Sequence, residues 1–320
     1  MTAPPALQFD PYQPDLQRDP YPLYHRLRGL APVVHTTIDG LDVYAVAHDR
    51  NVRRVLADWR AFTSHGGLSL HPRDDRMQAG VLIAADPEED VPGLSNHTDL
   101  LRVVAPYVSS RAIDQIRNDV TPYIATVVDE VVETGAFDAV TLGRRIPTEV
   151  VSNLVGLPRD GRDRYADWAI AATSMQGPAG AVTPELVEHL QAMQGYVGGL
   201  GQEGRLDPRG IGAKAFAAAA DPDSRVSLAD ATSIVWGGFI VAGMHTTIMA
   251  IAYLFWYLAS YPDQWRRYRD WHAAGDPGRS RWIDELLRRE VIFPHGYRTA
   301  VRDVELDGYT IPAGARVLVL

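Results

Sequence analysis

Residues 242–247 read Ala-Gly-Met-His-Thr-Thr, and they lie inside a nearly continuous apolar run from Ile234 to Ala259. At about 1.5 Å of rise per helical residue, that run is long enough to cross a bilayer. Polar residues near its middle, and the lack of a second such run in the sequence, favour a buried core helix instead. The sequence therefore predicts a long central helix inside a folded core, and no membrane anchor.

The polar residues of this stretch predict a break in the helix. Gly243 weakens a helix by about 1 kcal/mol relative to alanine, and the hydroxyls of Thr246 and Thr247 can bond to carbonyls one turn back. This combination predicts a local kink beside a ligand cavity. The alternative is purely structural: Gly243 permits close helix packing, the threonines bond to the backbone, and His245 is a core histidine with satisfied hydrogen bonds.

Helical periodicity dominates the rest of the chain. Turn signals at residues 39–40 and 307–308, both Asp-Gly, predict two β-hairpins, and residues 315–320 predict an apolar strand. Ser227, followed three residues later by Asp230, predicts the N-cap of the central helix. Residues 198–212 predict a glycine-rich loop, and further helices are expected over residues 98–108, 111–132, 148–154, 160–172, 184–197, 262–271 and 280–290. The predicted fold class is mainly α with small β elements, and we expect residues 1–320 to form a single domain.

The composition excludes several classes of function. The formal net charge is −9, whereas a nucleic-acid-binding surface needs clustered cations, so no nucleic-acid partner is expected. The absence of cysteine excludes disulfides, zinc–thiolate sites and cysteine nucleophiles. The first ten residues lack a basic segment followed by an apolar one, so we expect a cytoplasmic protein rather than a secreted one.

Further motifs follow the central helix. Glu285 and Arg288 lie at i and i+3 of a predicted helix, where they can pair or bind a common partner. Residues 297–300 read Tyr-Arg-Thr-Ala, and residues 303–314 read Asp-Val-Glu-Leu-Asp-Gly-Tyr-Thr-Ile-Pro-Ala-Gly. In this order, after the Ala-Gly-x-x-Thr-Thr helix, these motifs resemble those of cytochrome P-450. Asp-Pro-Tyr-Pro at 19–22 and Gly-Leu-Pro at 156–158 fit its bacterial soluble class, and the resemblance covers nearly the whole chain.

The resemblance implies catalytic roles for residues of the central helix. Thr246 matches the alcohol that helps to deliver protons during oxygen activation, and Ala242 and Gly243 match the kink over the distal face of the heme. His245 stands where the family usually has an acid. Imidazole titrates at about pH 6.5, so His245 could relay protons, or it could block or ligate a distal iron position.

Residues that bind heme propionates in the family also have counterparts. Arg298 matches one propionate-binding arginine, and His97 matches the histidine of a His-Thr segment. The second basic position of that segment is Leu101 here, with Arg102 one place later, and residues 90–96 are an insertion before His97. Glu285 and Arg288 match the structural Glu-x-x-Arg pair.

The chain departs from the family at its end. It stops at Leu320, before the loop that carries the cysteine ligand in the family. We therefore expect a P-450-like fold without its C-terminal heme-ligand region, and no metal ligand among these residues. The resemblance implies heme, but the chain supplies no thiolate ligand for it. Without the thiolate, the electron push that favours O–O cleavage is also missing.

Three interpretations of function follow. The first is an incomplete copy of a monooxygenase that oxidises a small organic substrate with O2 and takes electrons from a separate ferredoxin-type partner. The second is a heme-free relative that acts as an auxiliary protein for a partner enzyme, or as a cofactor-independent enzyme, in a biosynthetic pathway. The third is a relic that folds poorly. In the first case, the loop over residues 62–96 is a candidate lid, and residues 168–182 line or cover the pocket.

Overall fold

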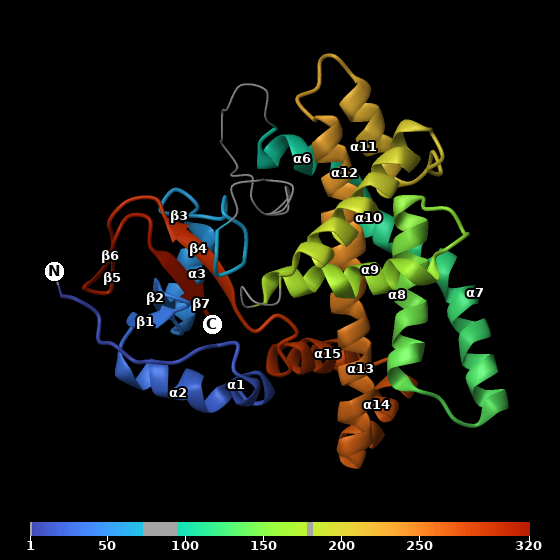
Figure 1. Ribbon diagram of the computed structural model, residues 1–320. Coiled ribbons are helices and arrows are strands. Elements are labelled where there is room, and N and C mark those ends of the chain that lie inside the picture. The colour runs from blue at the N-terminus through green and yellow to red at the C-terminus, as the bar shows by residue number, and fades with distance from the viewer. Residues whose placement is uncertain (1, 73–94, 178–181) are drawn as a thin grey trace.

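Helices make up most of the architecture (Figure 1). The computed structural model describes residues 2–72, 95–177 and 182–320. In Figure 1 the strands and the first three helices lie on one side of the molecule, and the remaining helices lie on the other. This arrangement confirms the predicted fold class, mainly α with small β elements.

A five-stranded sheet brings the two ends of the chain together. Its order is β1 (Val34–Ile38), β2 (Leu41–Val46), β7 (Arg316–Val319), β4 (Gly296–Ala300) and β3 (Phe62–Thr63). Strands β2 and β7 are parallel, and the other neighbours are antiparallel. The sequence places β7 last, yet it lies in the middle of the sheet.

Both predicted hairpins are confirmed. The first joins β1 to β2 through Asp39 and Gly40, whose φ angles are 48° and 76°, in the left-handed region. The second joins β5 (Val304–Leu306) to β6 (Tyr309–Ile311) through Asp307 and Gly308, which also have positive φ.

The helices that precede the central helix fall into two groups. Beside the sheet lie α1 (Pro14–Arg18), α2 (Tyr21–Leu30) and α3 (Asp49–Ala57). The helical side contains α6 (His97–Val104), α7 (Ser110–Thr134), α8 (Ala139–Val155), α9 (Asp163–Thr173), α10 (Pro184–Gln202) and α11 (Ile211–Ala220). Two helices, α14 (Pro262–Ala273) and α15 (Gly278–Arg289), follow the central helix.

Two stretches differ from the prediction. Helix α8 begins at Ala139, nine residues before the predicted start, and continues through Pro147. The predicted loop over residues 198–212 is shorter than expected, because α10 continues to Gln202 and α11 begins at Ile211, which leaves residues 203–210 as the loop. The glycine at 198 serves helix packing instead: a Cβ added at Gly198 would lie 3.4 Å from the hydroxyl of Thr232.

The central helix consists of three parts in direct succession. These are α12 (Leu228–Ser233), the π-helical segment η4 (Ile234–Met244) and α13 (His245–Ser260). By length and composition, the helix is apolar enough to cross a membrane. Its first part lies in the main core, where Ile240 and Met244 have 0% exposure. The prediction of a buried core helix is confirmed for that part.

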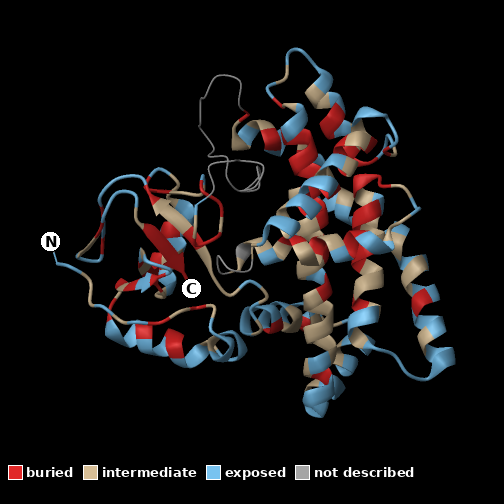
Figure 2. Ribbon diagram, viewed as in Figure 1, coloured by how far each residue is buried: buried red, intermediate tan, exposed pale blue. Residues whose placement is uncertain are grey.

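The second part of the central helix is only partly buried. Most of residues 249–260 have intermediate exposure, and Trp256 is 52% exposed. Figure 2 shows the corresponding end of α13 mostly in the intermediate and exposed colours. An apolar groove of about 1060 Å³ runs along it, with Phe137, Phe255 and Trp265 among the residues that line it. Residues 249–260 are therefore less buried than predicted, although Leu258 is buried.

Candidate functional site

The central helix changes its hydrogen-bonding pattern at the motif that the sequence singles out. The π-helical segment ends at Met244, and regular α-helix resumes at His245. The Thr246 hydroxyl donates to the carbonyl oxygen of Ala242 at 2.6 Å, and the Thr247 hydroxyl donates to that of Gly243 at 2.7 Å. Stretches of π-helix often occur at functional sites. The expected break in the helix is therefore present, as is the expected bonding of the threonines to the backbone.

A cavity of about 570 Å³ lies against this break. Helix α9 and the turn after it, helix α10, residues 67–69 and residues 291–295 close it from other sides. Its walls are mostly apolar, and among the described residues none of the lining side chains is Asp, Glu, Lys or Arg. The cavity is lined by Tyr12, Gln17, Gly67, Leu68, Ser69, Ala172, Thr173, Met175, Gly177, Val187, Leu190, Gln191, Gln194, Trp236, Gly237, Val241, Ala242, His245, Thr246, Tyr253, Val291, Ile292, Phe293, Pro294 and His295.

Three predicted site residues line this cavity: Ala242, His245 and Thr246. His245 is half-buried, and burial lowers the pKa of its imidazole, so the ring is neutral at pH 7. Gly243 faces helix α8 instead, where an added Cβ would lie 3.4 Å from Val151. For Gly243, the alternative of close helix packing agrees with the structure.

The loop segments expected around the pocket are only partly described. Residues 67–69 belong to the expected lid over 62–96, and they line the cavity, whereas residues 73–94 lie outside the described residues. Between 168 and 182, four residues up to Gly177 line the cavity, and residues 178–181 lie outside the described part.

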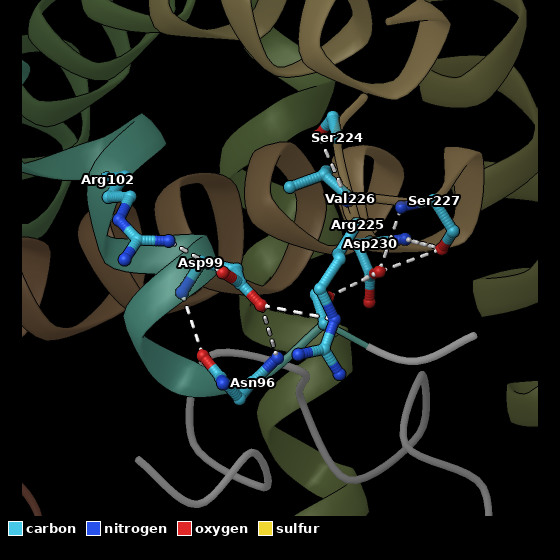
Figure 3. Close-up of polar contacts among 9 residues, drawn as sticks. Asn96, Asp99, Arg102, Ser224, Arg225, Val226, Ser227 and Asp230 are labelled. Carbon is cyan, nitrogen blue, oxygen red and sulfur yellow. Dashed lines mark hydrogen bonds and ion pairs between the residues drawn. The ribbon is translucent and has the colours of Figure 1, made fainter. Parts of the chain in front are cut away.

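The predicted propionate-binding residues lie elsewhere. His97 is the first residue of α6, and Arg102 lies in its last turn. Figure 3 shows the Arg102 side chain directed to Asp99, with which it forms an ion pair at 2.8 Å. Arg298, in β4, donates to the carbonyl oxygen of Tyr297 at 3.0 Å. His97, Arg102 and Arg298 are not among the cavity-lining residues described above, so their role toward a propionate stays a prediction.

Glu285 and Arg288 form the expected pair on helix α15. The guanidinium donates to both carboxylate oxygens of Glu285 at 2.6 Å, and this contact lowers the pKa of that carboxyl group. Both side chains are largely exposed to solvent. The pairing is confirmed, and a structural role for it stays a prediction.

A polar cluster fixes the start of the central helix against α6. Asp230 is 6% exposed, and one of its oxygens accepts hydrogen bonds from the hydroxyls of Ser95 and Ser227 at 2.6 and 2.9 Å. The same oxygen accepts the backbone N–H of Ser227, which completes the predicted capping box. A second capping box, Asn96 with Asp99, begins α6, and Arg225 contacts Asp99 at 3.7 Å (Figure 3).

We expect the substitution Asp230→Ala to lower the free energy of unfolding by about 2–3 kcal/mol, because it removes a cap and the hydrogen bonds of two hydroxyls and one backbone N–H to a buried carboxylate. Urea unfolding followed by circular dichroism measures this change. The control is Asp263→Ala, at the exposed start of α14, where we expect a change within about 0.5 kcal/mol. Equal stability of the two variants would contradict the assignment.

Two residues near the cavity, the half-buried His295 and the buried Arg316, escaped the sequence analysis. His295 lines the cavity and packs edge-on against Tyr12, with ring centroids 5.3 Å apart. Arg316, in β7, is 3% exposed and holds residues 67–70, part of which line the cavity, by hydrogen bonds to their carbonyl oxygens. The only sequence signal for His295 is its place at the end of the apolar run before β4.

No protein-family model matches the chain. Individual proteins do. The chain is 29% identical over 320 residues to cytochrome p450 CYP199A2 of Rhodopseudomonas palustris, an alignment that covers 98% of this chain and 74% of that protein. It is 29% identical over 325 residues to the cytochrome P-450 monooxygenase PikC of Streptomyces venezuelae, covering 99% of this chain and 74% of that protein.

Solved structures show the same fold. The complex of P-450BioI with hexadec-9Z-enoic acid ligated acyl carrier protein matches with a TM-score of 0.79 at 18% identity, over 96% of this chain and 78% of that one. The epothilone D-bound cytochrome P-450epoK matches with a TM-score of 0.78 at 24% identity, over 98% and 78%. The order of motifs and the similarities along nearly the whole sequence agree: the chain is a homologue of bacterial cytochromes P-450, and it has the fold of their solved structures.

Proposed function

We propose that this chain forms the substrate-binding and proton-handling part of a P-450-type monooxygenase that oxidises a small organic substrate with O2. A separate ferredoxin-type protein as the electron donor and a cytoplasmic location belong to the same proposal. One observation carries it: Ala242, His245 and Thr246 meet at the break of the central helix and line one largely apolar cavity. Relatives named as monooxygenases support it, and no comparison favours the heme-free alternative.

The residues of this chain fit one side of a heme. Gly237 and Ala242 are small, so the helix leaves open space at these two positions where it borders the cavity. We propose Arg298, His97 and Arg102 as partners of the propionates. The sequence has no cysteine, so a thiolate ligand would have to come from outside residues 1–320. When bound, a heme supplies an iron centre that activates O2 and accepts electrons.

The side chains of the cavity handle protons and exclude water. The Thr246 hydroxyl donates to Ala242, and its oxygen can still accept a hydrogen bond from a ligand or water. His245 is neutral at pH 7, so it can accept a proton at one ring nitrogen and release one from the other. The apolar walls, with Trp236 and Leu190 among them, favour an apolar substrate over water.

The test is an absorption titration of the purified protein with heme. We expect a saturable heme spectrum without a thiolate band, because the chain has no cysteine. Addition of a small thiol should then produce the thiolate-type band in the reduced, carbon monoxide-bound form.

We expect Ala242→Trp to abolish heme uptake because it fills the cavity, whereas the matched Ala259→Trp, on the same helix but outside the cavity, should not. A folded protein without any heme band would contradict the proposal and favour the heme-free alternative.

A further inference from the structure

Three aromatic side chains form a continuous path from the cavity wall toward the surface. Trp236 lines the cavity and is 4% exposed. Its ring centroid lies 6.3 Å from that of Trp168 in α9, and the Trp168 centroid lies 5.6 Å from that of Tyr196 in α10. Both distances fall within the range of about 4.5–7 Å that is typical of rings in direct contact. Electrons can therefore pass along this path in two short steps.

The outer end of the path meets solvent beside a positive charge. Trp168 and Tyr196 are half-buried, and Arg164 is exposed. The guanidinium carbon of Arg164 lies 5.0 Å from the ring centroid of Tyr196 and 5.5 Å from that of Trp168. A cation over a ring opposes the loss of an electron that leaves the ring positively charged. It does not oppose oxidation of Tyr196 when the hydroxyl proton leaves as well, because the product is then neutral.

Tyr165 is a second neighbour of Trp168, but it lies inside the protein. The two ring centroids are 5.4 Å apart, and Tyr165 has 0% exposure. Burial raises the pKa of its hydroxyl, so release of a proton is more difficult there than in water. Oxidation of a phenol to a neutral radical requires the loss of that proton. The path therefore ends at Tyr196 and not at Tyr165.

The inner end of the path lies where an oxidant would form. A heme that activates O2 in the cavity supplies strongly oxidising chemistry, and without a substrate this oxidant would attack the protein. The chain has no cysteine, so tryptophan, tyrosine and methionine are its most readily oxidised side chains. Trp236 is the only tryptophan among the described residues that line the cavity.

We propose that Trp236, Trp168 and Tyr196 carry one-electron oxidising equivalents out of the cavity when no substrate is present. Trp236 gives an electron to an oxidant formed from O2 or a peroxide, Trp168 replaces that electron, and Tyr196 replaces the electron of Trp168. Tyr196 releases its hydroxyl proton to water and becomes a neutral radical, which takes a hydrogen atom from a soluble thiol. In sum, the oxidant gains one electron, water gains one proton, and the thiol becomes a thiyl radical.

This inference rests on the proposed function, since it requires an oxidant in the same cavity. It goes beyond that function because it assigns the chain a protective path that no substrate enters. The path also connects residues of three helices that no sequence motif links.

Spin trapping locates the radical. The full chain is loaded with heme and treated with hydrogen peroxide and a nitroso spin trap, without substrate or thiol, and the adduct is identified by peptide mass spectrometry. We expect the adduct on Tyr196. It should be lost in Tyr196→Phe, and also in Trp168→Phe and Trp236→Phe, which interrupt the path. The matched control is Tyr165→Phe, which removes a tyrosine equally close to Trp168 and should leave the adduct unchanged.

Three results would overturn the proposal: an adduct on Tyr196 that persists in Trp168→Phe, an adduct on Tyr12 or Tyr253 of the cavity wall instead, or no protein adduct in the heme-loaded chain. Heme uptake shows that each variant is folded. If a tryptophan variant fails to fold, the comparison of Tyr196→Phe with Tyr165→Phe still decides.

A second measurement needs no heme. Azide radicals from pulse radiolysis oxidise tryptophan, and electron transfer within the chain converts the indolyl absorption into that of a tyrosyl radical. We expect Trp168→Phe and Tyr196→Phe to lose a part of this conversion that Tyr165→Phe retains, at a rate independent of protein concentration. Equal conversion in all variants would overturn the proposal.

The two proposals can fail separately. A chain that takes up no heme contradicts the proposed function, and the azide measurement then decides whether Trp168 passes its oxidation to Tyr196. A chain that takes up heme but forms no adduct on Tyr196 leaves the proposed function intact and overturns the path.

Discussion

Replacement of Arg316 by alanine is expected to lower the free energy of unfolding by about 3–5 kcal/mol, the largest effect that the structure predicts for a single side chain. Arg316 is 3% exposed. Its guanidinium donates to the carbonyl oxygens of Leu70, at 3.0 Å, and of Gly67 and Ser69, and to the Thr299 hydroxyl at 2.7 Å. Alanine would leave these buried acceptors without donors.

Among the described residues, no carboxylate forms an ion pair with the Arg316 guanidinium. Burial, with a further contribution from the nearby charge of Arg298, lowers the pKa of Arg316 to about 10. The group therefore remains protonated at pH 7, and carbonyl dipoles with the face of Tyr297, 5.3 Å away, replace the missing anion. Lysine has fewer donors and no planar group, so Arg316→Lys should recover only part of the lost stability.

Denaturant unfolding of the two Arg316 variants measures the effect, with Arg266→Ala as the control. Arg266 forms an exposed pair with Asp263, so its removal should change stability by no more than about 0.5 kcal/mol. Arg316→Ala should also weaken binding in the cavity, because residues 67–69 form part of its wall. A variant as stable as the control would show that these hydrogen bonds are not needed.

Features that depend on neighbours in sequence were predictable. The two Asp-Gly turns, the capping box of Ser227 with Asp230 and the pair of Glu285 with Arg288 each involve residues at most four positions apart. The hydrogen bond from Thr246 to Ala242 was predictable for the same reason, since one helical turn separates the hydroxyl from its acceptor. Local backbone geometry determines these contacts, so the sequence carries their signal directly.

Features that depend on distant contacts were not predictable in the same way. Proline and glycine usually mark ends of helices, yet Pro147 and Gly198 lie inside helices, where contacts with other helices outweigh local preference. Arg316 looks like an ordinary strand residue until β7 places it beside residues 67–70. The single domain over residues 1–320 and the propionate partners stay predictions, because no contact described above tests them.

Acid is expected to destabilise this protein through His295, and His295→Phe is expected to remove that part of the pH dependence. In the folded chain burial holds the pKa of His295 at about 4, whereas an unfolded chain has a histidine pKa of about 6.5. Between these values the unfolded chain binds a proton that the folded chain does not bind. The free energy of unfolding therefore falls as the pH decreases from 6.5 to 4, and below that range this group adds no further change.

The full effect is at most about 3.5 kcal/mol, since each of the 2.5 pH units between 6.5 and 4 contributes up to about 1.4 kcal/mol. His245, whose pKa burial also lowers, acts in the same direction, whereas the carboxylate of Asp10 raises the pKa of His295 and reduces the effect. The free energy of unfolding of the unaltered protein and of His295→Phe is measured at pH 7 and at pH 4.5. The carboxyl groups then contribute equally to the two proteins, so the difference between them reports on His295. The unaltered protein should lose more stability than the variant. Parallel losses would mean that the ring of His295 takes up its proton equally well in the folded state, and that burial does not lower its pKa.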